Sequence, residues 1–234
     1  MKLKDFLTIS RANIQVSTIP TALFGIVLSK NSIFSLMSAL YILLYLLIIT
    51  FACNINCLYD YGVDLKYKKS MAYAVKNLGK HTIKKILFVE AAVILAVMLY
   101  FFISAKFLTS VFALLGLFLS YAYSATPLRL KSKGFFSFAP TFFGLYFISI
   151  LGGYYLYSPP DFKITIFAFS YAMLNQGITF VNTCEDFEED KEAGITTFAH
   201  FFGFKKTLLV SVLMTLTGGA GLFIYSKSFF FLLS

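Results

Sequence analysis

"MSALYILLYLLIITFACNINCLYDYGVD", residues 37–64, is the stretch that decides the fold. It carries no charged side chain before Asp60, so it exceeds the roughly 20 apolar residues that an α-helix needs to cross a bilayer. Its last part presents Asn56, Asp60 and Asp64 at a spacing of four residues. We therefore predict a membrane-spanning helix that leaves the lipid at a polar, acidic end.

Apolar runs of similar length recur along the whole chain. The 234 residues are 59% hydrophobic and 13% charged, with a mean hydropathy of +0.79, whereas a soluble domain is about 25% charged. A closed barrel would need alternating strands of about ten residues, which the sequence lacks. We predict an all-α, multi-pass transmembrane helical bundle that forms one domain over residues 1–234. About seven spans are expected, at 14–30, 33–57, 83–104, 107–125, 135–157, 162–183 and 207–226.

The basic residues are unevenly distributed between the predicted loops. Sixteen of the 20 Lys and Arg side chains belong to the N-terminus and to the segments after the second, fourth and sixth spans. Positively charged loops stay on the cytoplasmic side. We therefore predict a cell-membrane protein whose N-terminus and long loops are cytoplasmic. The lipid bilayer or an anionic ligand accounts for the net charge of +9, and we expect no nucleic-acid partner.

The acidic motif at the end of the second span has a copy further along the chain. "NTCEDFEED", residues 182–190, repeats the order Asn, Asp, Asp at a spacing of four with Asn182, Asp186 and Asp190. Chance composition predicts about 0.004 occurrences of this pattern, so two occurrences indicate a repeat. Each copy stands where a predicted span reaches the cytoplasmic side.

Residues four apart share one face of a helix, so each motif presents a stripe of oxygen atoms. Like charges at this spacing repel unless a cation lies between them. Mg²⁺ prefers oxygen ligands and is usually held by one or two carboxylates together with substrate phosphates. We predict that the two motifs hold a diphosphate through Mg²⁺, although a solvated helix end would be the simpler interpretation of either motif alone. The predicted metal ligands are Asn56, Asp60, Asp64, Asn182, Asp186 and Asp190.

Four segments resemble the UbiA superfamily of intramembrane prenyltransferases, and they follow the family's order. "NCLYDYGVD" (56–64) resembles the first aspartate motif, and "NTCEDFEEDKEAGITT" (182–197) resembles the second. "YSATPLRLKSKG" (123–134) is similar to the loop after the fourth helix, and "ISRANIQVSTIPTALFG" (9–25) to the opening with its Arg before the first helix. The chain departs from the family at Cys57, where Asp is common, and in its lysine-rich loop after the first motif.

The resemblance implies a fold and an activity. It implies a bundle, usually of nine helices, around a central cavity that the two motif loops cap. It also implies Mg²⁺-dependent transfer of an isoprenyl chain from a prenyl diphosphate to a hydrophobic, often aromatic acceptor, such as a lipid or quinone precursor. Because the chain stops at "SKSFFFLLS" (226–234) where an eighth span would begin, we expect either a trimmed variant or a chain that lacks its C-terminal helices.

The family's site residues carry over to matching positions of this chain. The implied catalytic residues are Asp60, Asp64, Asp186 and Asp190. The implied diphosphate-binding residues are Arg11, Lys68, Arg129, Lys131 and Lys191, although a positive-inside loop would carry such residues without any catalytic role. Tyr123 is implied to face the prenyl carbocation. On a polar stripe of the sixth span, Asn175 either contacts the acceptor or forms an interhelical hydrogen bond.

Glu90 is a lone acid two turns into the third span. We expect its side chain to snorkel toward Lys84 and Lys85, with a role as a base as the lesser alternative.

Other functions remain as alternatives. A UbiA-type terpene cyclase would rearrange a prenyl chain without an acceptor, and the sequence does not distinguish it from a transferase. A divalent-cation transporter would need polar groups deep in several spans, whereas the acids here gather at one interface. A CDP-alcohol phosphotransferase would carry an Asp-Gly-x-x-Ala-Arg run, which is missing. A metal site of Cys53 and Cys57 with Cys184 or His200 fits no zinc spacing, and buried thiols are the simpler interpretation.

Overall fold

The computed structural model describes residues 3–231, apart from the side chains of Ile14, Ser17 and residues 227–231. Within this range the chain forms helices, turns and bends but no strand, so the prediction of an all-α fold is confirmed. The last three residues of "SKSFFFLLS" lie outside the described residues.

Six helical segments among the described residues are long and apolar enough to cross a membrane. They are α3 (Leu36–Tyr67), α5 (Lys80–Ile103), α6 (Phe107–Ser124), the Gly134–Tyr155 segment, α8 (Phe162–Glu185) and the Phe204–Ser226 part of α11 (Phe204–Phe231). The first predicted span, 14–30, corresponds to α2 (Ala12–Leu28), whose 17 residues are near the lower limit of about 17–25 for crossing. The chain is therefore a multi-pass membrane protein, and each predicted span corresponds to a helical segment.

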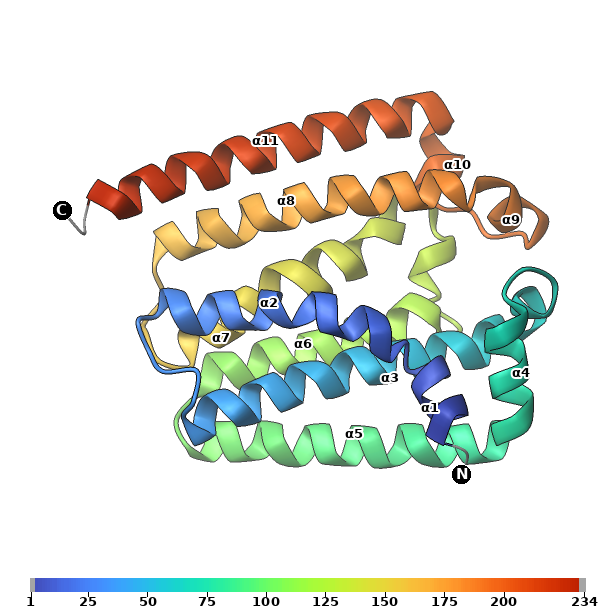
Figure 1. The fold of residues 1–234 in the computed structure, drawn as a ribbon, viewed down its shortest axis with the longest axis horizontal. Coiled ribbons are helices and arrows are strands. Elements are labelled where there is room, and N and C mark those ends of the chain that lie inside the picture. Colours follow the sequence, from blue (N-terminus) through green and yellow to red (C-terminus); the bar gives the residue numbers. More distant parts are fainter. Residues whose placement is uncertain (1–2, 232–234) are drawn as a thin grey trace.

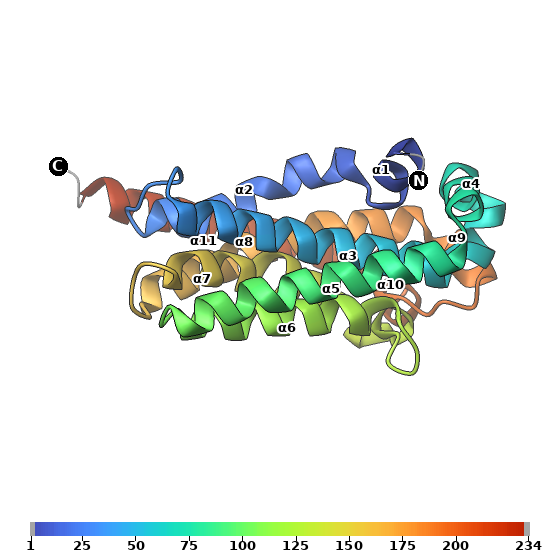
Figure 2. The same ribbon diagram turned by 90° about the horizontal axis from the view of Figure 1, so that it is seen from below.

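Both acidic motifs lie at the same end of the bundle. The short helices there are α1 (Leu3–Ile9), α4 (Lys69–Leu78), η1 (Leu130–Ser132), α9 (Phe187–Glu192) and α10 (Phe198–Phe202). In Figure 1 this end is on the right, and the second view in Figure 2 also shows α1, α4, α9 and α10 there. The basic segments after α3, α6 and α8 gather at this end too.

Local chemistry explains where several helices begin and end. Ser35 caps α3 by accepting a hydrogen bond from the Ser38 amide at 3.1 Å, and Asp161 caps α8 in the same way. Gly79 separates α4 from α5 with a φ of 80°, a conformation that costs glycine little. The chain can therefore turn sharply from the short surface helix into the next span.

The fifth span is less regular than its uniform hydropathy suggests. It consists of the 3₁₀ helix η2 (Gly134–Phe138), the π-helix η3 (Pro140–Phe147) and the α-helix α7 (Ile148–Tyr155). Pro140 begins η3 and lacks the amide hydrogen that a continuous α-helix would need at this point. Irregular turns of this kind are frequent at functional sites, and this one forms part of a cavity wall described below.

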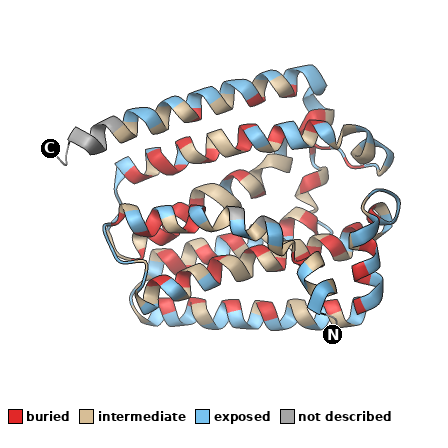
Figure 3. Cartoon of the chain, in the orientation of Figure 1, coloured by how far each residue is buried: buried red, intermediate tan, exposed pale blue. Residues whose placement is uncertain are grey.

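The helices pack through a central α3 and a tight outer pair. α3 contacts α2, α5 and α6, and it contributes more residues to the largest buried cluster than any other helix in the described part of the chain. α11 packs mainly against α8 at one edge, and Figure 3 shows its surface to be largely exposed. A Cβ atom on Gly218 of α11 would lie 2.6 Å from the Ser170 carbonyl oxygen of α8. Small residues thus let these two backbones touch, as in many membrane helix pairs.

Candidate active site

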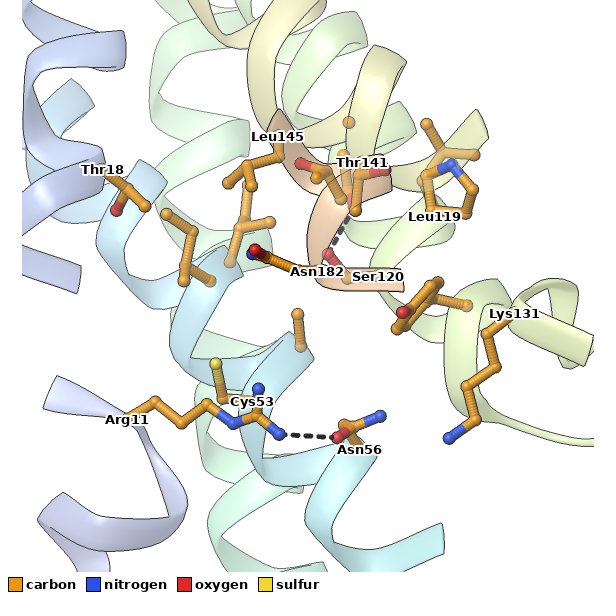
Figure 4. A pocket seen from close by; sticks show the side chains of 18 of the residues that line it. Arg11, Thr18, Cys53, Asn56, Leu119, Ser120, Lys131, Thr141, Leu145 and Asn182 are labelled. Carbon is orange, nitrogen blue, oxygen red and sulfur yellow. Dashed lines mark hydrogen bonds between the residues drawn. The ribbon is translucent and has the colours of Figure 1, made fainter. Parts of the chain in front are cut away.

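A cavity of about 440 Å³ runs between α3, α6, the fifth span and α8. Leu44, Ile48, Phe112 and Ile148 contribute to an apolar section of its wall. Its polar section contains all six predicted metal ligands, Asn56, Asp60, Asp64, Asn182, Asp186 and Asp190. In Figure 4, Asn56 of the first motif and Asn182 of the second lie beside the same space. The fold therefore brings the two copies of the repeat together.

Asp60 is the most strongly neutralised acid of the site. It is 8% exposed, and it forms ion pairs with Lys131 and, at 3.4 Å, with the Arg129 guanidinium. The Asn56 amide donates hydrogen bonds to Asp60 Oδ2 at 2.8 Å and to Ser124 Oγ at 3.1 Å. Lys131 is itself buried, and burial lowers the pKa of its ammonium group although Asp60 opposes this shift. Cation and acid are thus held together out of water.

Asp64 and Asp190 carry negative charge that the protein does not fully neutralise. Asp64 is 4% exposed, and its Oδ2 atom is buried without a hydrogen-bond partner within the described part of the chain. Burial, and then the charge of Asp186, raise the pKa of the Asp190 carboxyl to about 6. A buried acceptor without a partner is uncommon in native proteins. These acids therefore fit a bound cation.

Divalent-cation binding at this site would need further ligands from outside the protein. Among residues 3–231, no group of three or more His, Cys, Asp or Glu side chains could hold a metal ion by itself. Mg²⁺ usually takes only one or two carboxylates and completes its shell with water and phosphate oxygens. The carboxylates and asparagine oxygens of the two motifs fit Mg²⁺ that is shared with an anionic ligand.

Lys68 joins the two motifs. It follows α3 directly, and its Nζ atom lies 2.9 Å from Glu189 Oε1 and 3.8 Å from Asp186 Oδ2 of the second motif. Lys66 and Tyr67 both contact Glu192 on the outer side of this junction. Lys68 lines the cavity, so an anion bound there could compete with Glu189 for it.

Two arginines offer hydrogen-bond donors to such an anion. Arg11 donates to Asn56 Oδ1 at 3.3 Å, a bond drawn in Figure 4. The Nε atoms of Arg11 and Arg129 are buried and have no hydrogen-bond partner in the described structure. Both residues adopt left-handed backbone conformations, with φ of 49° and 38°, which are strained for side chains other than glycine. Strained residues with unused donors are typical of ligand sites.

Three of the predicted site residues do not line the cavity, namely Arg129, Lys191 and Asn175. Arg129 nevertheless reaches the site through Asp60. Lys191 is exposed on α9, and the Asn175 amide donates to the Tyr171 carbonyl of its own helix at 2.9 Å. Tyr123, which the family resemblance implies to face the prenyl carbocation, lines the cavity.

Sequence reasoning missed two residues of the site. Glu189 lines the cavity and binds Lys68; its position three residues after Asp186 places it on the same helical face, so the signal was present. Ser124 accepts a hydrogen bond from Asn56; it belongs to the segment 123–134 that resembles the family, but its residue type gave no sign of this contact.

The expectation for Glu90 is wrong. Its side chain is 7% exposed, and its Oε1 atom accepts a hydrogen bond of 2.7 Å from Asn54 of α3. Glu90 therefore points into the bundle and does not snorkel to the membrane surface, because Asn54 offers a buried partner. Of the residues considered for the alternative Cys/His metal site, the three cysteines are free thiols, and His200 bonds to Thr197 and to the Phe187 carbonyl.

Comparisons with known proteins agree on one family. A model of the UbiA prenyltransferase family matches residues 18–234. A UbiA homolog from Archaeoglobus fulgidus bound to GPP and Mg²⁺ superposes with a TM-score of 0.77 at 20% identity, covering 98% of this chain and 78% of that one. A structure of a UbiA homolog from the same organism bound to DMAPP and Mg²⁺ gives a TM-score of 0.73 at 20% identity, with coverage of 95% and 86%. No curated protein sequence matches significantly.

Proposed function

Because this chain belongs to the UbiA prenyltransferase family, we propose that it is a Mg²⁺-dependent intramembrane prenyltransferase. Its substrates are a prenyl diphosphate and a hydrophobic acceptor, often aromatic, such as a lipid or quinone precursor. The observation that carries this proposal is the meeting of both acidic motifs at one cavity, with Lys68 and Lys131 among them. Solved UbiA homologs bound to prenyl diphosphates and Mg²⁺ share this fold and support the same ligands here.

The two motifs hold the diphosphate end of the substrate. Asn56, Asp60, Asp64, Asn182, Asp186 and Asp190 would hold Mg²⁺. When bound, Mg²⁺ supplies positive charge that stabilises the diphosphate as the allylic carbon–oxygen bond breaks. Lys68, Lys131 and the arginines add donors for the charge that grows on the leaving group. Each 1.36 kcal/mol of such stabilisation is worth about tenfold in rate.

The apolar section of the cavity receives the prenyl chain. Leu44, Ile48 and Ile148 are apolar wall residues that exclude water from the reacting carbon. Tyr123 lies at the motif end of α6, and its ring can stabilise a desolvated allylic cation by up to about 2 kcal/mol. The acceptor instead of water then captures the carbocation, and the acceptor's own displaced C–H or O–H proton is released to solvent.

The bundle is oriented with its motif end toward the cytoplasm. This part of the proposal rests on the excess of Lys and Arg in the segments that gather at that end. A water-soluble diphosphate would then approach from the cytoplasm while its chain enters the lipid-embedded cavity.

Turnover on defined substrates tests the proposed function. The protein in lipid nanodiscs is incubated with Mg²⁺, a lipid extract and prenyl diphosphates of five to twenty carbons, and diphosphate release and product masses are measured. An adduct of the chain and an acceptor supports a transferase. Diphosphate release with a cyclised chain and no adduct would instead make the protein a cyclase, and no release with any substrate would refute the proposal.

A further inference from the structure

A chain of buried polar side chains lies outside the cavity. Ser10 Oγ donates to Asn54 Oδ1 at 3.1 Å, and Asn54 Nδ2 donates to Glu90 Oε1 at 2.7 Å. The three residues are 2%, 0% and 7% exposed. None of them lines the cavity, yet they connect α5, α3 and the junction between α1 and α2. We call Ser10, Asn54 and Glu90 the polar relay.

The burial of the Glu90 carboxyl group in the bundle is unfavourable in free energy. A carboxyl group in the membrane interior costs free energy unless it is well paired, and Glu90 Oε2 has no hydrogen-bond partner in the described structure. An apolar residue would fill a helix interface at lower cost. The placement of Glu90 therefore indicates a function that packing alone does not explain.

The polar relay ends at a strained residue of the site. Ser10 immediately precedes Arg11, whose φ of 49° is left-handed. Such a conformation persists only where the surroundings enforce it. Gln15 bonds to the Ser10 carbonyl at 2.7 Å and to Thr50 of α3 at 2.9 Å, so the Ser10 backbone and side chain are both fixed to α3. The direction of the Arg11 side chain is thereby set from outside the cavity.

Arg11 in turn contacts the first motif. Its guanidinium donates to Asn56 Oδ1, and the Asn56 amide donates to Asp60. Asn54 and Asn56 thus hold two consecutive residues, Ser10 and Arg11, from one stretch of α3. If Asn54 lost its partner on α5, its amide could rotate away from Ser10 and release the junction.

We propose that Glu90 is a positioning residue that acts through Asn54 and Ser10 to aim Arg11 at the substrate diphosphate. The proposal rests on the proposed function, because it needs an anionic substrate at Arg11. It assigns to a buried acid of α5 a role in substrate affinity, although that acid touches neither the cavity nor the substrate.

A double-mutant cycle tests this proposal without relying on turnover. The dissociation constant of a geranyl thiolodiphosphate, which is not cleaved, is measured with Mg²⁺ by calorimetry for the wild type, Glu90→Ala, Arg11→Ala and the double variant. Glu90→Ala should raise the dissociation constant about tenfold, since it removes the acceptor that holds the Asn54 amide. In the Arg11→Ala background the same change should have no further effect, because residues that act through one another are not additive.

Two control variants separate positioning from folding. Glu90→Gln keeps an oxygen that accepts from Asn54 and should bind within about twofold of the wild type. Thr109→Ala removes a buried hydrogen bond to the Gly152 carbonyl, away from the cavity lining, and should lower the melting temperature without changing the dissociation constant. If Glu90→Ala does not insert, Ser10→Ala breaks the same polar relay and replaces it in the cycle.

The outcomes are distinguishable. Equal losses of affinity from Glu90→Ala with and without Arg11 would overturn the positioning role while leaving the proposed function intact. Binding by Glu90→Gln that is as weak as binding by Glu90→Ala would overturn the positioning role in the same way. A wild-type protein that neither binds the geranyl thiolodiphosphate nor releases diphosphate from any prenyl diphosphate would overturn the proposed function, and the positioning role with it.

Discussion

At the scale of single residues, the site combines cations and acids that are held at different strengths. Asp60 is buried between Lys131 and Arg129, whereas Lys68 stands half-exposed between the motifs. Removing one member of a buried charged cluster leaves its partners unpaired, which costs several kcal/mol. Exposed pairs contribute little. The same kind of substitution should therefore have very different effects at different positions.

Asp60→Asn should lower kcat/KM at least about a hundredfold, because it removes the negative charge of the first motif that forms ion pairs with the cations of the site. The protein should still insert, because Asn preserves the size of the side chain. Prenyl transfer in nanodiscs measures the loss. Asp161→Asn is the matched control: Asp161 caps α8 away from the cavity, and Asn caps equally well. Wild-type activity of Asp60→Asn would refute the site.

Lys68→Gln should raise the KM for the prenyl diphosphate about tenfold, because Lys68 lines the cavity and pairs there with acids of the second motif. Lys66→Gln provides the comparison two residues away. The Lys66–Glu192 pair has side chains that are 65% and 53% exposed, and such pairs contribute about 0–1 kcal/mol. Steady-state kinetics should show a KM within about twofold of the wild type for Lys66→Gln. Similar KM values for both variants would contradict the role of Lys68.

At the scale of the elements, hydropathy predicts the spans well because the bilayer imposes one length and one composition on every helix. It could not reveal that the fifth span contains a 3₁₀ and a π segment, since backbone irregularity inside protein leaves the apolar character of the sequence unchanged.

The direction of the Glu90 side chain was missed for a related reason. Whether an acid snorkels depends on a partner across the helix interface, here Asn54, and the sequence does not display such pairs.

The interface between α8 and α11 depends on glycine at particular positions. A Cβ atom at Gly218 would lie 2.5 Å from the Leu174 amide nitrogen, whereas one at Gly219 would meet only a side-chain carbon at 3.9 Å. Gly218→Ala should therefore destabilise the fold by about 1–3 kcal/mol through forced separation of the backbones.

Gly219→Ala is the neighbouring control and should be neutral or stabilise the helix by up to about 1 kcal/mol. Unfolding in mixed SDS and mild-detergent micelles measures both free energies. Equal destabilisation by the two substitutions would show that close contact of α8 with α11 does not matter for stability.

At the scale of the whole molecule, the two copies of the repeat could be predicted to form one site. Each copy stands at the end of a helix, on the side of the membrane that carries the basic loops. Composition and spacing thus sufficed for the bundle and for its acidic end, whereas the cavity that the six motif residues line was implied by the family resemblance. The residues that support the motifs from behind could not be predicted, because Ser124 and the Ser10–Asn54 contact join segments far apart in the chain. Pairings of this kind depend on three-dimensional packing that one sequence does not encode in any simple pattern.

Mg²⁺ together with pyrophosphate should raise the melting temperature by about 5 °C when present well above its dissociation constant, because it binds only where both motifs are folded together. EDTA should remove this shift and abolish transfer. Asp186→Asn should show no shift, since it weakens the second motif alone. Thermal unfolding followed by a dye that reacts with newly exposed cysteine thiols checks the result, and an unchanged melting temperature in the wild type would contradict shared binding.

α11 packs mainly against α8 and is otherwise largely exposed, and α8 ends at the second acidic motif. A spanning helix tilts when the thickness of the surrounding hydrocarbon changes. Because glycines of α11 pack directly on α8, a tilt of α11 would move α8 as well. A change in bilayer thickness would thus be transmitted through α8 to the end of the bundle that carries the second acidic motif. Turnover in vesicles of phosphatidylcholines with about 14, 18 and 22 carbons per acyl chain should therefore peak at one thickness, and a flat response would show that the two helices move independently.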